Sequence, residues 1–192
     1  HHPCEMRCRR ADVDSSVNMR EVHRFIADEI YRQKKENVYI NKLLKEKSGK
    51  TGKKIAIVGS GPTGLTAAFY LARLGHEVVI YDSNSKPGGM LQYAIPEYRL
   101  PKKILEKEIN LIRKMGVKFV FNTKIDKKSL KNLEKNYNAV FLAIGAYKEI
   151  KLNILNENSK GVLSGVEFLK EINSGIKPSI GREVLVIGAE ML

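Results

Sequence analysis

The sequence contains few cysteines. Cys4 and Cys8 are the two that occur, and none follows residue 8. A small secreted protein held together by disulfides needs several paired cysteines. This usage therefore argues against a disulfide framework and favours a reducing cytoplasm.

Long apolar runs are also lacking, and we expect no signal peptide at the start. No stretch of about 18 or more apolar residues occurs, which excludes a membrane-spanning helix. The start, HHPCEMRCRR, is too polar to supply the apolar centre of a signal peptide. It also lacks an initiator methionine, so we expect a chain that is processed, tagged or cut from a longer protein.

Acidic residues are outnumbered by basic ones. The 34 Lys and Arg against 21 Asp and Glu give a net charge of +13. A basic balance can attract nucleic acid or an acidic protein. No nucleic-acid-binding motif accompanies the charge, and the aromatic residues do not interleave with the basic ones. We expect a solvated lysine-rich surface and no nucleic-acid partner; an acidic partner is the alternative.

Residues 1–50 are expected to form a polar arm with one amphipathic helix. In VNMREVHRFIADEIYRQ the apolar residues recur at helical spacing, at Val22, Phe25, Ile26 and Ile30. Asn18 and Glu21 fit a variant capping box at the start of this helix. SGKTG, residues 48–52, is typical of a linker.

Residues 51–180 carry strand and helix patterns in alternation. Short apolar strands are expected at 55–59, 77–82, 118–122 and 139–145. Helices are expected at 62–74, from Pro101 onward, at 129–136 and at 164–172, and a further strand at 183–188. The helix after Pro101 has an apolar face formed by Ile104, Leu105, Ile109, Ile112 and Met115. This alternation predicts an α/β fold with a mainly parallel sheet covered on both faces.

A glycine-rich turn follows the first of these strands. Gly59, Gly61 and Gly64 form G-x-G-x-x-G between a strand and a helix. The first glycine permits a tight turn, the second lets the backbone approach a pyrophosphate, and the third lets the helix pack closely on the strand. The helix N-terminus directs free N–H groups and a partial positive charge at the phosphates. The strand–turn–helix unit therefore predicts a dinucleotide site.

The residues after the turn narrow the choice of dinucleotide. Asp82 ends the second strand, where a carboxylate can accept hydrogen bonds from ribose hydroxyls and disfavours a 2′-phosphate. The site should hold FAD or NAD rather than NADP. A second glycine pair, Gly88 and Gly89, allows another backbone approach and favours the longer FAD. Residues 83–101 contain no cysteine, whereas flavin disulfide reductases place a redox pair in this region, so electrons must leave a flavin by another route.

Three further segments are PGGMLQYAIPEYRLPKKILEKEINLIRKMGVKF, AVFLAIGA and GVLSGVEFLKEINSG. They resemble the small-subunit family of bacterial glutamate synthase. The start, HPCEMRCRRADVDSSVNMREVHRFIAD, is similar to the iron–sulfur arm of that family. The N-terminal half of dihydropyrimidine dehydrogenase and the large subunit of NADH-dependent ferredoxin:NADP oxidoreductase are relatives with the same pattern.

The resemblance implies a domain plan and an electron-transfer reaction. It divides the chain into a helical iron–sulfur-type arm (1–50), an incomplete Rossmann-like FAD-binding domain (51–180) and the first strand of a truncated NAD(P)H-binding domain (181–192). NAD(P)H would reduce FAD, and electrons would pass through [4Fe–4S] clusters to a larger catalytic or electron-accepting subunit. The flavin carries this chemistry, so no catalytic side chain is expected. A non-catalytic flavin-binding fragment and a ferredoxin-linked subunit are the alternatives.

The resemblance also implies particular site residues. Those expected around FAD are Gly59, Gly61, Pro62, Gly64, Asp82, Gly89, Met90, Leu91, Arg99, Ile125, Ala143 and Gly145. Cys4 and Cys8 would be half of the four ligands that a [4Fe–4S] cluster needs. Two idle thiols, or a zinc site assisted by His1, His2 or His23, are the other readings of that pair.

Overall fold

The structure is a computed structural model that describes residues 2–148, 151 and 153–188. It divides into two compact units, His1–Glu46 and Lys47–Leu192. The division falls close to the arm boundary expected near residue 50.

The first unit is helical. Its elements are α1 (Pro3–Met6), the 3-10 helix η1 (Arg9–Asp12), α2 (Met19–Arg32) and α3 (Glu36–Lys45). Ile40 and Leu43 of α3 are buried, whereas Phe25 of α2 is 67% exposed. The amphipathic helix expected after Asn18 is therefore present, but much of its apolar face is solvent-accessible.

The expected capping box of α2 is wrong. Asn18 is the N-cap residue, but its side chain makes no capping hydrogen bond to the described residues, and Glu21 pairs with Arg20 instead. The backbone N–H of Arg20 donates to Glu5 Oε1 at 2.9 Å. A carboxylate from α1 thus satisfies one of the free N–H groups at the start of α2, which removes the need for a local cap.

The second unit contains a four-stranded parallel sheet, as the sequence predicts. Its strands are β1 (Lys54–Val58), β2 (Glu77–Tyr81), β3 (Lys118–Val120) and β4 (Ala139–Leu142), in the order β3-β2-β1-β4. In the register, Ile57 of β1 lies between Ile80 of β2 and Phe141 of β4. Ile57 and Ile80 are fully buried, as central strands of a parallel sheet require.

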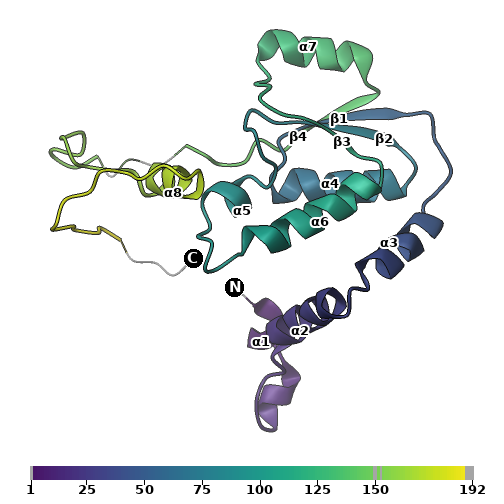
Figure 1. Ribbon diagram of the computed structural model, residues 1–192, viewed down its shortest axis with the longest axis horizontal. Coiled ribbons are helices and arrows are strands. Elements are labelled where there is room, and N and C mark those ends of the chain that lie inside the picture. Colours follow the sequence, from purple (N-terminus) through teal and green to yellow (C-terminus); the bar gives the residue numbers. More distant parts are fainter. Residues whose placement is uncertain (1, 149–150, 152, 189–192) are drawn as a thin grey trace. The chain divides into compact units, whose positions relative to one another are not determined.

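Helices cover both faces of this sheet. Figure 1 shows α4 (Pro62–Arg73) and α6 (Lys102–Lys114) on one face and α7 (Lys127–Asn136) on the other. The face under α7 has a core of Ala56, Val58 and Leu133. The two remaining helices are α5 (Met90–Tyr93) and α8 (Gly165–Asn173).

The apolar pattern of α6 is confirmed. Leu105, Ile109 and Met115 are buried, and Ile104 and Ile112 are half-buried. In the part of the chain that the structure describes, no helix combines the length and apolar character needed to cross a membrane.

The strand expected at 183–188 is not formed in the described chain. These residues belong to no strand, and Leu185 is 87% exposed. An apolar run becomes a strand only where another strand pairs with its N–H and C=O groups, and no such partner lies beside this segment among the described residues. The following residues of that expected domain, 189–192, lie outside the described residues.

Candidate functional site

The carboxyl ends of β1, β2 and β4 surround a cavity of about 420 Å³. The glycine turn from Gly59 to Pro62 forms one part of the lining, and Asp82, Ser83 and Asn84 after β2 form another. Ligand sites of open parallel sheets lie in this position, because loops diverge where neighbouring connections run in opposite directions.

At two positions of the motif, packing within the protein leaves no room for a side chain. A Cβ at Gly59, whose φ is +105°, would lie 2.2 Å from the carbonyl oxygen of Ala143. A Cβ at Gly64 would lie 2.0 Å from the carbonyl oxygen of Gly59. Close packing of the turn against β4 and of α4 against the turn therefore excludes a side chain at both positions, as expected for Gly64.

Gly61 differs from both. Its backbone is extended, with φ −72° and ψ −177°, which any residue adopts. Beyond the adjoining residues, no atom of the described chain lies within 4 Å of a Cβ built there. Gly61 lines the cavity and is the N-cap of α4, with Pro62 in the first helical turn. The protein therefore leaves open space at a helix N-terminus, as a bound phosphate group requires.

Asp82 is buried at this site, and the structure pairs it with protein donors. Its exposure is 7%, and that of Ser60 is 0%. Asp82 Oδ2 accepts hydrogen bonds from the backbone N–H of Ser60 at 2.8 Å and from the Ser60 hydroxyl. Oδ1 accepts from the backbone N–H of Asn84 at 2.8 Å and from its side-chain amide at 3.1 Å. These four bonds match the roughly four lone-pair sites of a carboxylate.

Ser60 also joins the two glycine segments. Its carbonyl oxygen accepts the N–H of Gly88 at 2.9 Å. At Gly89, where φ is +55°, a Cβ would lie 2.8 Å from Gly61 Cα. The second glycine pair therefore brings the start of α5 against the first turn. The sequence offered one signal for Ser60: a small residue between two glycines of the motif.

Lysine and asparagine side chains hold the segment after Gly89. Lys102 Nζ donates to the carbonyl oxygens of Leu91 at 2.8 Å and Ile95 at 2.6 Å, and burial lowers the pKa of this ammonium group. Asn173 of α8 donates to the carbonyl oxygen of Tyr93 at 3.0 Å. These contacts fix α5 beside the cavity.

The cavity brings together most of the residues expected to bind a cofactor. Its lining includes Gly59, Gly61, Pro62, Asp82, Gly89, Met90, Ile125, Ala143 and Gly145. Gly64 is buried beneath the turn, Leu91 is half-buried in α5, and Arg99 is exposed in the loop after it; none of the three lines the cavity.

Other lining residues were not expected from the sequence. They are Val58, Ser60, Tyr81, Ser83, Asn84, Thr123, Lys124, Ile144, Tyr147 and Lys170. Most of them adjoin residues that were expected. Their positions near the ends of predicted strands are the sequence signal that could have identified them. Lys170 lies on α8, where no sequence pattern singled it out.

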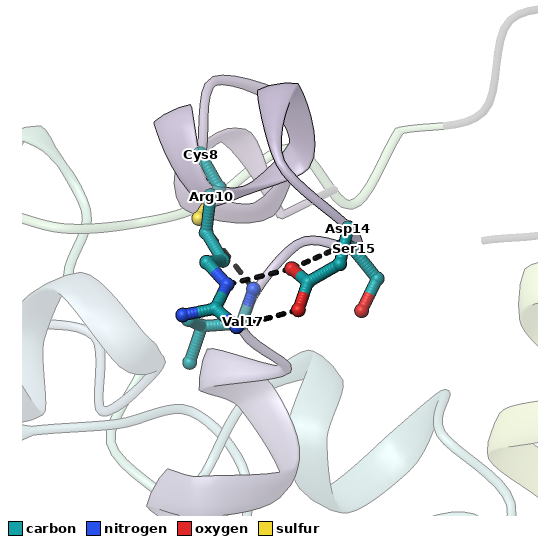
Figure 2. A network of polar contacts seen from close by, with 5 residues as sticks. All are labelled: Cys8, Arg10, Asp14, Ser15 and Val17. Carbon is teal, nitrogen blue, oxygen red and sulfur yellow. Dashed lines mark hydrogen bonds and ion pairs between the residues drawn. The ribbon is translucent and has the colours of Figure 1, made fainter.

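The arm places the two cysteines differently. Cys4 is exposed, and Cys8 is partly exposed. Figure 2 shows Cys8 beside Arg10 of η1, which pairs with Asp14; the N–H of Val17 points to Cys8 Sγ at 3.5 Å. Hydrogen bonds from the backbone of Val17, and then of Arg10, lower the pKa of the Cys8 thiol because they favour the thiolate.

A complete metal site is not assembled in the described arm. Across residues 2–148, 151 and 153–188, no three His, Cys, Asp or Glu side chains gather closely enough to hold a metal ion. His1, one of the residues considered for a zinc site, lies outside the described residues. Cys4 and Cys8 thus remain a predicted pair of ligands.

Known proteins resemble this chain over nearly its whole length. This chain is 38% identical over 193 residues to the NADPH-Fe(3+) oxidoreductase subunit beta of Geobacter sulfurreducens, covering 97% of this chain and 28% of the relative. It is 36% identical over 197 residues to the glutamate synthase [NADPH] small chain of Bacillus subtilis, covering 97% of this chain and 39% of the relative. The chain thus spans well under half the length of these relatives, and the similarity expected from its segments is confirmed.

A solved structure and a family profile agree with this relationship. Mycobacterium tuberculosis FprA in complex with NADPH superposes with a TM-score of 0.57 at 26% identity, over 64% of this chain and 29% of FprA. Residues 53–191 match the profile described as pyridine nucleotide-disulphide oxidoreductase. With its parallel sheet, glycine turn and strand-end cavity, the chain belongs to the pyridine nucleotide-disulphide oxidoreductase family.

Proposed function

We propose that this chain is the FAD-binding part of an NAD(P)H-dependent oxidoreductase that passes electrons to a partner subunit. The open position at Gly61 carries the proposal. Apart from Gly61 itself and the adjoining Ser60 and Pro62, no atom of the described chain lies within 4 Å of the place of its missing Cβ, although Gly59 and Gly64 are closely packed. Space kept at the N-terminus of α4 suits the pyrophosphate of a dinucleotide.

The residues of the chain have separate tasks in this proposal. The N–H groups at the start of α4 bind the pyrophosphate, and Asp82 orients a ribose by exchanging one of its present hydrogen bonds for a ribose hydroxyl. Met90 and Gly89 direct the rest of the cofactor along α5. FAD, when bound, supplies the hydride-accepting and electron-releasing chemistry. Because residues 83–101 contain no cysteine, a disulfide in that segment cannot be the electron acceptor.

The proposed electron acceptor is a larger subunit of the glutamate synthase type. The resemblance to the Bacillus subtilis small chain supports this choice. The similarity to the Geobacter sulfurreducens subunit makes another electron-accepting partner the competing assignment. Glutamate formation from 2-oxoglutarate and glutamine, after addition of a purified glutamate synthase large chain and NADPH, distinguishes the two.

A visible absorption spectrum tests the proposed function. The chain is reconstituted with FAD, freed of excess cofactor and kept without oxygen, and spectra are taken before and after addition of NADPH or NADH. We expect flavin bands that remain with the protein, because FAD binding is the task assigned to this chain; bleaching on addition of one of the two would show that the chain also accepts hydride from it. Bands that stay unbleached favour a non-catalytic flavin-binding part, and a protein that retains no flavin contradicts the proposal.

A further inference from the structure

The cavity has a wall that the glycine motif does not include. Tyr147 follows β4, and Lys170 lies on α8; both line the cavity together with Gly145. Neither residue belongs to the strand–turn–helix unit that predicts dinucleotide binding.

The hydroxyl of Tyr147 is buried without a hydrogen-bond partner in the described part of the chain. Burial raises the pKa of Tyr147, and the charge of Asp82 adds to the effect. A phenol O–H removed from water without an acceptor has an unfavourable free energy, so such groups normally have a protein, water or ligand partner. The nearby carboxylate of Asp82 already accepts four hydrogen bonds from Ser60 and Asn84. The acceptor for Tyr147 must come from elsewhere.

Lys170 adds a positive charge to the same wall. Asn173 lies one turn further along α8, on the same face, and its amide donates to the carbonyl oxygen of Tyr93 at 3.0 Å. Tyr93 is buried, with an exposure of 6%. This contact anchors α8 to α5 and orients the face that carries Lys170 toward the cavity. An unpaired hydroxyl donor and an ammonium group in one wall suit an anion with several acceptor oxygens.

We propose that Tyr147 and Lys170 bind the diphosphate of the dinucleotide, as a second set of contacts beside the N-terminus of α4. Tyr147 donates its hydroxyl to a phosphate oxygen, and Lys170 supplies charge at the cavity edge. The proposal rests on the proposed function and extends it by assigning diphosphate recognition to the chain after β4.

Ligand titrations on two variants test this assignment. FAD and ADP are titrated into the wild-type chain, Tyr147→Phe and Lys170→Met. Tyr70→Phe and Lys177→Met are matched controls, because Tyr70 is 57% exposed on α4 and Lys177 is exposed beyond α8. We expect Tyr147→Phe to weaken FAD and ADP by the same factor, about tenfold, as for loss of a hydrogen bond to a charged group. Lys170→Met should weaken both by about threefold, and more at low salt.

Thermal unfolding without ligand supplies a second readout. Because the Tyr147 hydroxyl has no partner in the described chain, Tyr147→Phe should leave the unfolding temperature of the ligand-free protein unchanged or raised, while it reduces the increase caused by FAD. A Tyr147→Phe variant that binds FAD and ADP as tightly as the wild type overturns the inference and leaves the proposed function intact. A ligand-free Tyr147→Phe protein of clearly lower stability also overturns it, since the hydroxyl then has a structural partner. A wild-type chain that binds neither FAD nor ADP overturns the proposed function itself.

Discussion

A buried carboxylate organises the site at the scale of single residues. Asp82 is buried and receives two hydrogen bonds from Ser60 and two from Asn84. Its first task is therefore to hold the loop after β2 against the glycine turn. The sequence indicated that Asp82 binds a ribose but did not indicate this structural task. A strand-end acid does not reveal which groups of the folded chain donate hydrogen bonds to it.

Replacing Ser60 by alanine tests the structural role of this contact. Ser60→Ala removes the hydroxyl donor and leaves one lone pair of a buried carboxylate unsatisfied, so we expect a loss of about 2 kcal/mol in the free energy of unfolding. Urea denaturation measures it. Ser85→Ala is the control, because Ser85 is exposed in the following loop. Equal stability of the two variants would contradict the role given to Ser60.

Tyr137 gives the protein a distinct behaviour at high pH. Its hydroxyl and that of Tyr81 form a hydrogen bond of 2.8 Å; burial, followed by this bond, raises the pKa of Tyr137 to about 12. An unfolded tyrosine loses its proton near pH 10. The unfolded chain therefore binds fewer protons than the folded chain between about pH 10 and 12, and this contribution to stability is complete below pH 10 and lost as pH rises toward 12.

The Tyr137→Phe variant isolates the contribution of the Tyr137 hydroxyl to stability. We expect the stability difference between the wild type and Tyr137→Phe to be largest below pH 10 and to narrow from pH 10 to 12. Denaturation at a series of pH values, with tyrosinate absorbance recorded in parallel, measures it. A difference that stays constant across this range would show that Tyr137 titrates normally.

At the scale of elements, close backbone packing determines how α4 sits on β1. A Cβ at Gly64 would meet the carbonyl oxygen of Gly59 at 2.0 Å and a methyl group of Ile57 at 3.3 Å. The backbone oxygen cannot move without opening the turn, so we expect Gly64→Ala to cost about 3 kcal/mol of unfolding free energy or more.

A glycine in another helix provides the control for this substitution. Gly165 begins α8, and beyond the adjoining residues and the backbone of its own helix no atom of the described chain lies within 4 Å of its Cβ position. Gly165→Ala should be neutral or slightly stabilising, because alanine favours the helix. Thermal unfolding of the two variants compares them; a tolerated Gly64→Ala would contradict the packing described for the turn.

Local patterns predicted the elements well where a short stretch of sequence carries the periodicity of its helix or strand. The buried face of α6 and the strands β1 to β4 are of this kind. Two expectations failed for the same reason. At the start of α2 the N–H of Arg20 donates a hydrogen bond to Glu5, which belongs to another helix. The apolar run at 183–188 has no neighbouring strand among the described residues. Such non-local partners leave no trace in a local pattern.

At the scale of the whole molecule, the sequence predicted the part of the site that lies between Gly59 and Asp82. There, turn, helix and strand end are consecutive, so their spacing determines their geometry. The wall formed by Tyr147 and Lys170 could not be predicted in this way, because tertiary packing of α8 on α5 brings it to the cavity. The family resemblance added Gly89, Met90, Ile125, Ala143 and Gly145 to the expected lining, whereas only the folded chain reveals that Tyr147 and Lys170 belong to it.

In the proposed function, the space beside Gly61 accommodates the pyrophosphate of a dinucleotide. Alanine at this position adopts the required backbone, and its methyl group meets no atom of the described chain beyond the adjoining residues, so Gly61→Ala should change the free energy of unfolding by no more than about 1 kcal/mol. Its methyl group would occupy the expected pyrophosphate position. The decisive measurement is an FAD titration of the wild-type and Gly61→Ala chains, followed by flavin fluorescence. We expect tight binding by the wild type and binding at least about tenfold weaker by the equally stable variant; equal binding by both chains, or no binding by the wild type, would show that this space does not serve a dinucleotide.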